Sequence, residues 1–136
     1  MPVVPSFLDT NVLLYAFAED ARASRAQSLL ADPFVTSVQA LNEFANVGRK
    51  KLGLPWTRIY DVVETIVDLS VSILPIDEKT TLSALKLAER YNFSYYDAAM
   101  IAAALQGKCE RYYSEDLHDG LVVEKQLTII NPFRES

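Results

Sequence analysis

Short apolar runs alternate along this chain with segments of helical length, and this alternation limits its fold more than any other feature. The strand-like runs, rich in β-branched and aromatic residues, are Phe7-Leu8, Phe34-Val35, 71–76, 109–113 and 127–130. The segments with helical patterning are 12–17, 22–30, 38–52, 55–69, 77–91 and 98–106. Strands that alternate with helices predict an α/β domain with a mainly parallel sheet, here of about five strands. Because the 136 residues contain no linker or repeat, we expect one domain over residues 1–136.

The charge balance excludes a broad positive surface as the basis of function. The chain has 13 basic and 18 acidic residues, a net charge of −5, whereas proteins that bind nucleic acid through phosphate contacts usually carry a basic footprint. A local cluster of carboxylates remains open, because a bound divalent cation reverses the sign of the field around it. The composition does not choose between such a cluster and an ordinary acidic surface.

The remaining composition predicts a protein of a reducing cytoplasm. Cys109 is the only cysteine, so no intrachain disulfide can form, and its apolar surroundings in the sequence predict a buried thiol. The first residues lack a signal-peptide pattern, and no apolar run approaches the roughly 20 residues that cross a bilayer. We therefore expect a cytoplasmic location and no membrane partner.

Four acidic residues occupy positions that favour a shared site. Asp9 and Asp116 each follow a predicted strand, and ligands gather beyond the carboxyl ends of parallel strands. Glu43 lies on the polar side of the predicted helix 38–52. Asp97 precedes the uncharged run 98–105, which predicts a buried helix, and an acid beside buried structure usually has a partner or a metal.

Each acid also has an ordinary structural explanation. Asp9 can cap the helix that follows it, and Glu43 can be a solvated side chain in the middle of a helix. Asp97 completes a capping box with Ser94, and Asp116 suits a turn. A similar box, with Thr36 at the N-cap, is predicted to open the helix that carries Glu43.

Oxygen ligands from distant parts of the chain suit a hard divalent cation such as Mg²⁺, which keeps several waters and bridges to phosphates. A zinc site is disfavoured because His118 is the only histidine, and its polar loop predicts a surface position.

Four segments in their order along the chain resemble the acidic motifs of one family, the PIN domains. These segments are Phe7-Leu8-Asp9-Thr10-Asn11-Val12-Leu13-Leu14-Tyr15, Ser37-Val38-Gln39-Ala40-Leu41-Asn42-Glu43-Phe44, Tyr95-Tyr96-Asp97-Ala98-Ala99-Met100-Ile101-Ala102-Ala103-Ala104 and Tyr113-Ser114-Glu115-Asp116-Leu117. The end of the chain, Ile129-Ile130-Asn131-Pro132-Phe133, is similar to the tail of many VapC-like members. The chain thus resembles a PIN-domain ribonuclease of the VapC type, the toxin of a type II toxin–antitoxin system.

This resemblance implies a three-layer α/β/α domain and a pocket for Mg²⁺ or Mn²⁺. The implied ligands, which would also be the catalytic groups, are Asp9, Glu43, Asp97 and Asp116. Side chains expected to orient them are Thr10, Asn11 and Ser114, and an additional acid whose position varies in the family is Asp119. The implied reaction is hydrolysis of RNA phosphodiester bonds by metal-activated water. The implied partners are an RNA substrate, a VapB-like antitoxin and a second copy of the chain.

Two surfaces are expected to serve these partners. Basic residues predicted to hold the RNA backbone are Arg49, Lys50 and Lys51. Apolar residues cover about half the circumference of the helix 55–69, more than one sheet contact requires. Residues predicted to border a groove for an antitoxin segment are Trp56, Tyr60 and Val63. The competing explanation is that this helix is wedged between its own sheet and the helix 38–52.

Other functions remain as alternatives. A phosphatase of the haloacid dehalogenase type also begins with an acid after its first strand, but it usually has a second Asp where this chain has Asn11. A response-regulator receiver has a similar length, yet it needs adjacent acids early in the chain, a phosphoacceptor Asp after its third strand and a Lys after its fifth. Here the fourth predicted strand is followed by Glu115-Asp116 and the last by Asn131-Pro132-Phe133. A catalytically silent PIN scaffold or RNA-binding module is disfavoured because all four acids are present.

Overall fold

A computed structural model describes residues 3–134, which form six helices and six strands. The strands are β1 (Ser6–Leu8), β2 (Phe34–Ser37), β3 (Ser72–Leu74), β4 (Arg111–Tyr113), β5 (Val122–Val123) and β6 (Leu127–Ile130). The helices are α1 (Thr10–Ala16), α2 (Ala23–Ala31), α3 (Val38–Lys50), α4 (Trp56–Leu69), α5 (Glu78–Tyr91) and α6 (Tyr95–Gln106). None of the helices in this part of the chain has the length and apolar character needed to span a membrane.

The strands form one sheet in the order β3-β2-β1-β4-β6-β5, and every neighbouring pair is parallel except β5 with β6. The predicted α/β class with a mainly parallel sheet is confirmed. The sheet has one strand more than expected, because β5 pairs with β6 after a three-residue connection, residues 124–126. The Gln126 N–H donates to the Val123 carbonyl, which closes a turn with Glu124 and Lys125 at its centre. Both turn residues have positive φ angles, 52° and 57°, as in a type I′ hairpin, although neither is the Asn or Gly that usually marks such a turn.

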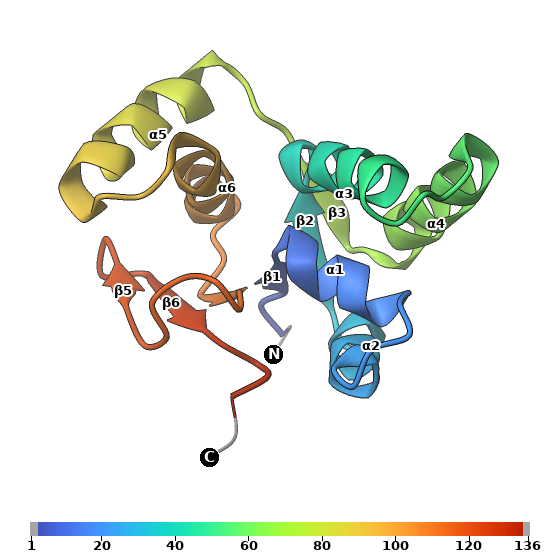
Figure 1. The fold of residues 1–136 in the computed structure, drawn as a ribbon. Helices are drawn as coiled ribbons and strands as arrows, with labels where there is room; N and C mark the ends of the chain where they lie inside the picture. Colours follow the sequence, from blue (N-terminus) through green and yellow to red (C-terminus); the bar gives the residue numbers. More distant parts are fainter. Residues whose placement is uncertain (1–2, 135–136) are drawn as a thin grey trace.

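The helices cover the two faces of the sheet. The chain moves outward from β1 to β2 and β3, and then returns to the other side of β1 to form β4. Because crossovers between parallel strands are right-handed, this reversal places the helices of the last crossover on the opposite face. Accordingly α5 and α6 lie together on one side, and α1, α2, α3 and α4 lie on the other (Figure 1). The reversal point lies between the adjacent strands β1 and β4, where ligands bind in open α/β sheets.

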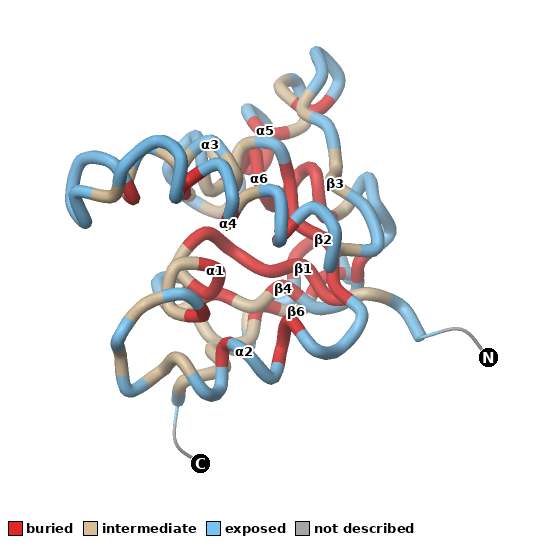
Figure 2. Tube along the Cα trace, turned by 90° about the vertical axis from the view of Figure 1, so that its right-hand side faces the viewer, coloured by how far each residue is buried: buried red, intermediate tan, exposed pale blue. Residues whose placement is uncertain are grey.

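Burial is greatest in the central strands and in α6, whereas α4 is largely exposed (Figure 2). Every residue from Ala98 to Ala104 of α6 is buried, as its uncharged sequence predicts. Phe7 of β1 stacks on Tyr112 of β4, with ring centroids 4.7 Å apart. Cys109 is buried, as expected, and burial raises the pKa of its thiol to about 11. The two strands that meet at the reversal point are therefore fixed by side-chain packing as well as by hydrogen bonds.

The N-cap predicted for α3 was wrong by one residue. The cap is Ser37, whose hydroxyl accepts a hydrogen bond from the Ala40 N–H at 3.1 Å. Thr36 is instead a buried residue of β2, and its hydroxyl donates to the Leu8 carbonyl at 2.8 Å. The Thr36 hydroxyl thus links β2 to β1, whereas Ser37 caps the helix that carries Glu43.

Candidate metal centre

The carboxyl ends of β1 and β4 bring two distant segments together. The Asp9 N–H donates to the Tyr113 carbonyl at 3.1 Å, and the two strands pair in parallel up to Leu8 and Tyr113. The next residues, Asp9 and Ser114, are both buried. The chain therefore places the start of α1 beside the loop that follows β4.

All four predicted carboxylates line one pocket, which has a volume of about 290 Å³. The residues around it are Asp9, Thr10, Asn11, Glu43, Asn46, Val47, Asp97, Met100 and Asp116. They come from β1 and α1, from α3, from the first turns of α6 and from the loop after β4. The fold thus brings the four acids to one site, as their positions after strands and at the start of a buried helix suggested.

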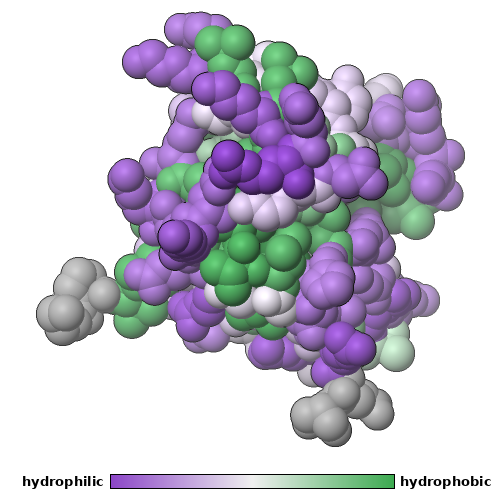
Figure 3. Space-filling view, turned by 90° about the vertical axis from the view of Figure 1, so that its left-hand side faces the viewer, coloured by the Kyte–Doolittle hydropathy of each residue, from purple (hydrophilic) through white to green (hydrophobic). Residues whose placement is uncertain are grey.

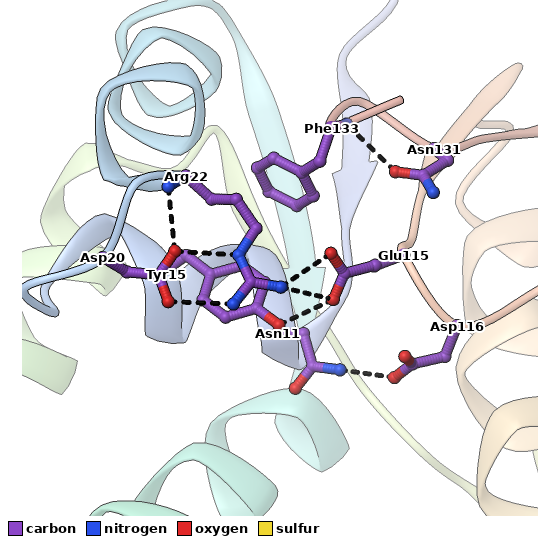
Figure 4. Close-up of polar contacts among 8 residues, drawn as sticks. All are labelled: Asn11, Tyr15, Asp20, Arg22, Glu115, Asp116, Asn131 and Phe133. Carbon is purple, nitrogen blue, oxygen red and sulfur yellow. Dashed lines mark hydrogen bonds and ion pairs between the residues drawn. The ribbon is translucent and has the colours of Figure 1, made fainter. Parts of the chain in front are cut away.

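Neutral side chains hold three of the carboxylates. The Thr10 hydroxyl donates to Glu43 Oε2 at 2.8 Å, and the Ser94 hydroxyl donates to Asp97 Oδ2 at 2.9 Å. The Asn11 amide donates to Asp116 Oδ2 (Figure 4). These contacts place Thr10 and Asn11 where side chains that orient the acids are expected.

Asp9 is the most buried of the four acids, with 6% of its surface exposed. It occupies the N-cap position of α1, but its side chain makes no capping hydrogen bond, which removes the simplest structural explanation for this residue. Burial raises the pKa of Asp9 from 3.8 to about 7; the charges of Asp97 and Glu43 add to the rise, and Ser114 offsets part of it. An isolated carboxylate in such a place is costly unless a proton or a cation compensates its charge.

The pocket fits a hard divalent cation in its chemistry. Its charged donors are all carboxylate oxygens, the preferred ligands of Mg²⁺. The Ser114 hydroxyl beside Asp9 is buried and forms no hydrogen bond of ordinary geometry within residues 3–134. As the side chains stand, no three acidic, histidine or cysteine side chains among these residues are close enough together to ligate one ion. Direct ligation of one cation by three of these carboxylates would therefore require them to move closer together.

Two neighbouring acids are engaged elsewhere. Asp119 accepts from the Asn131 N–H at 2.8 Å and pairs with Arg134 at 3.1 Å, and it does not line the pocket. Asp119 therefore lies outside the set of pocket carboxylates. Glu115, the residue before Asp116, is bound by Tyr15 and Arg22 (Figure 4). His118 is exposed, as predicted.

The predicted basic residues lie at the end of α3 beyond the pocket. Lys50 and Lys51 are exposed, and Lys50 is one helical turn beyond Asn46, which lines the pocket. Arg49 is partly occupied, because its guanidinium donates to the Leu54 carbonyl at 3.2 Å and lies over the Trp56 ring at 5.1 Å. Lys50 is thus the basic side chain best placed at the rim.

The sequence did not single out Asn46, Val47 or Met100 as pocket residues. Asn46 is one turn after Glu43 on the same helical face, a spacing that was available as a signal. Met100 lies in α6, and its sulfur lies 3.9 Å from the Thr10 hydroxyl oxygen, whose proton is donated to Glu43. No spacing in the sequence predicts this contact between residues that are 90 positions apart.

The pKa of Asp9 leads to a pH-dependence prediction. In the unfolded chain this carboxyl ionises near pH 4, whereas in the fold it stays protonated up to about pH 7. The folded state therefore binds more protons over this window, and the stability of the metal-free protein falls as pH rises from about 4 to 7, by roughly 4 kcal/mol at most. We expect Asp9→Asn to flatten this slope and to raise the melting temperature at pH 8, measured by thermal unfolding in EDTA.

The matched control is Asp77→Asn at the N-cap of α5. The pKa of Asp77 is lowered by hydrogen bonds from the Thr80 backbone and side chain, so this residue does not titrate in that window and its substitution leaves the slope unchanged. A wild-type slope in Asp9→Asn would show that Asp9 is not the group responsible.

Comparisons with known proteins agree with this architecture. The model of the PIN domain family matches residues 6–118. A toxin–antitoxin complex from Klebsiella pneumoniae has a TM-score of 0.71 at 21% identity, covering 96% of this chain and 99% of that one. VapC20 of Mycobacterium tuberculosis, a toxin that cleaves the sarcin–ricin loop, has a TM-score of 0.65 at 20% identity, covering 78% and 85%.

VapBC2 from Rickettsia felis, bound to a DNA fragment from its promoter, has a TM-score of 0.60 at 16% identity, covering 82% of this chain and 87% of that one. A search of curated protein sequences gives no match. These structures share the fold of the chain, and the family model spans most of its length, including all four pocket acids. The chain belongs to the PIN-domain family.

Proposed function

We propose that the protein is an endoribonuclease that depends on Mg²⁺ or Mn²⁺ and acts as the toxin of a toxin–antitoxin pair. One observation carries the proposal: four carboxylates from separate segments line one pocket at the reversal point of the sheet. The PIN-domain match and the fold shared with VapC toxins support RNA as the substrate class. A silent scaffold is disfavoured because it has no need to keep Asp9 buried at an energetic cost.

In this proposal each of the four acids reaches the pocket from a different part of the fold. Asp9 forms the buried end of the pocket, and Glu43, held by Thr10, and Asp97, held by Ser94, face it from α3 and α6. Asp116 completes the set from the loop after β4. A divalent cation, when bound, stabilises charge on phosphoryl oxygens and makes water a stronger nucleophile near neutral pH.

Substitution of one acid tests the activity. We expect the purified protein to cleave RNA in Mg²⁺ or Mn²⁺ and to lose cleavage in EDTA. Asp97→Asn should lower the cleavage rate by at least about 100-fold, because it removes an anionic ligand of the cation while keeping the size of the side chain. The readout is the rate at which a labelled RNA disappears, compared at equal folded fraction.

The control for that assay is Asp68→Asn, which changes an exposed acid near the end of α4, outside the pocket. Its rate should equal that of the wild type. Full activity in Asp97→Asn, or cleavage that persists in EDTA, contradicts the assignment of the centre.

Lys50 is proposed to contact the RNA backbone at the rim of the pocket, with Arg49 and Lys51 contributing nearby. In a protein of net charge −5, a local cation beside the site counts for more in phosphate binding than the overall field. The alternative is a solvated helix end whose basic residues interact favourably with the helix dipole.

A salt titration separates the two explanations. We expect Lys50→Ala to weaken RNA binding in Ca²⁺ and to reduce the slope of log affinity against log salt by about one. Lys86→Ala, at an exposed position on α5, is the control of equal charge. An unchanged slope in Lys50→Ala leaves only the solvated helix end.

The outer face of α4 is proposed to bind the antitoxin. Trp56 and Tyr60 are 59% and 66% exposed, whereas Ile59, Val62 and Ile66 form the buried face of the helix. Val63 is half-buried between the two faces. At the far end of α4, Leu69 borders an apolar hollow of about 440 Å³ between α1 and α2. An amphipathic helix along α4 would cover this exposed surface.

We expect Tyr60→Asp to weaken binding of the cognate antitoxin without lowering the melting temperature, because this side chain is mostly outside the core. Val3→Asp, at a similarly exposed position before β1, should bind normally. Isothermal titration with the partner measures both, and equal affinity of Tyr60→Asp and wild type places the antitoxin elsewhere.

The opposite side of the molecule offers a surface for the second copy that the family suggests. Figure 3 shows an apolar area surrounded by hydrophilic side chains on the side of α5 and α6. Exposed apolar side chains of α5 and β5 include Leu82, Leu85 and Val122. We propose a homodimer contact on this side, which leaves α4 free.

A further inference from the structure

Asp116 is carried by a loop with few backbone hydrogen bonds of its own. The Ser114 N–H donates to the Ile130 carbonyl, and the Gly120 N–H donates to the Ile129 carbonyl. Within the described chain, the N–H groups of residues 115–119 donate to no backbone carbonyl. Asp116 is exposed, and its side chain accepts a hydrogen bond from the Asn11 amide. The position of this acid therefore depends on the side chains that anchor the loop.

The neighbouring residue Glu115 is the anchor on the side of α1. Arg22 Nη1 lies 2.9 Å from Glu115 Oε2 and 3.1 Å from Oε1, and the Tyr15 hydroxyl donates to Oε1 at 2.6 Å (Figure 4). Burial alone would raise the pKa of Glu115, but the hydrogen bonds from Tyr15 and Arg22 lower it overall. Glu115 thus remains a carboxylate, and it accepts two hydrogen bonds from Arg22 and one from Tyr15.

The guanidinium of Arg22 is itself held in place. Asp20 Oδ1 accepts from Arg22 Nε at 2.8 Å, and Asp20 Oδ2 accepts from Nη2 at 2.9 Å. The guanidinium carbon lies 3.9 Å from the centre of the Tyr15 ring, and that ring meets Phe133 edge-on at 5.3 Å. Two carboxylates and one aromatic ring hold the Arg22 side chain. Its guanidinium therefore has a fixed position and does not move freely at the surface.

We propose that Arg22, together with Tyr15, is a positioning residue that fixes the loop after β4 through Glu115 and so presents Asp116 to the metal pocket. This inference rests on the proposed function, because it assumes that Asp116 contributes to cation binding. The contacts span 93 and 100 positions of sequence and tie the corner between α1 and α2 to the loop after β4.

Electrostatics make the sign of the effect diagnostic. Arg22→Ala removes a positive charge near a cation site, and Coulomb's law alone therefore predicts tighter Mn²⁺ binding. Loss of the anchor predicts the opposite result, because Glu115 and the loop are no longer held and Asp116 must be ordered when the cation binds. Residues that orient metal ligands typically change affinity by about 10- to 100-fold.

The experiment is Mn²⁺ titration of the full chain by calorimetry. We expect Arg22→Ala to weaken Mn²⁺ binding roughly 10-fold or more, and Arg22→Lys to recover only part of the loss, because an ammonium cannot reproduce the planar fork. In an Asp116→Asn background, Arg22→Ala should cause no further weakening. Unchanged or tighter binding in Arg22→Ala overturns the proposal, as does full additivity of the two substitutions.

The chain contains a matched control. Arg90 pairs with Glu124 at 2.8 Å, and the Tyr91 hydroxyl also donates to Glu124, so the same three residue types form a cluster between α5 and the turn after β5. Arg90→Ala should leave Mn²⁺ affinity unchanged, and an equal loss in this variant overturns the proposal.

Tyr15→Phe keeps the ring but removes one hydrogen bond to Glu115. It should weaken binding less than Arg22→Ala, and it supplies the test if Arg22→Ala does not fold. Binding as tight as that of the wild type in a folded Tyr15→Phe, with Arg22→Ala unfolded, overturns the proposal. Absence of Mn²⁺ binding in the wild type overturns the proposed function itself, whereas normal wild-type binding with an unaffected Arg22→Ala overturns only the role of the anchor.

Discussion

The burial of the Asp9 carboxylate beside other acids is the interaction on which the rest of this site depends. Asp9 follows two fully buried residues of β1, so the parallel pairing of β1 with β4 determines where its side chain can go. Burial and the charges of Asp97 and Glu43 raise the pKa of this acid to about 7. A proton or a cation has to balance that charge, and a site that exchanges one for the other binds metal more tightly as pH rises.

Three of the four acids lie at the end of a strand or in a helix, whereas the fourth lies on an irregular loop. Asp9 lies at a strand end, Glu43 within a helix of thirteen residues, and Asp97 in the first turn of the most buried helix. Asp116 lies on an irregular loop, which hydrogen bonds from Tyr15 and Arg22 to Glu115 hold on the side of α1 and contacts of Asp119 hold at the other end. The acids gather without a broad basic surface, so in the proposed function a bound cation and the few basic residues near it provide the attraction for phosphate.

The parts of this picture that follow from local rules were predictable from the sequence. Alternating patterns located the helices and five of the six strands, and the rule for strand ends pointed to Asp9 and Asp116. The sixth strand was missed because its turn uses Glu124 and Lys125 in a conformation that usually requires Gly or Asn. Long-range side-chain contacts were also out of reach: nothing in the sequence pairs Arg22 with Glu115, or shows that Asn131 and Arg134 engage Asp119.

The central claim is that one cation-binding pocket is built from acids of four segments, and anomalous diffraction tests it most directly. Crystals soaked in Mn²⁺ should show a manganese peak in the pocket, with Asp9 and at least one of Glu43, Asp97 and Asp116 turned inward to contact it. The same soak of Asp9→Asn crystals should show a much weaker peak. Manganese sites found only on the outer surface, or a pocket that stays free of manganese at saturating concentration, would contradict the account.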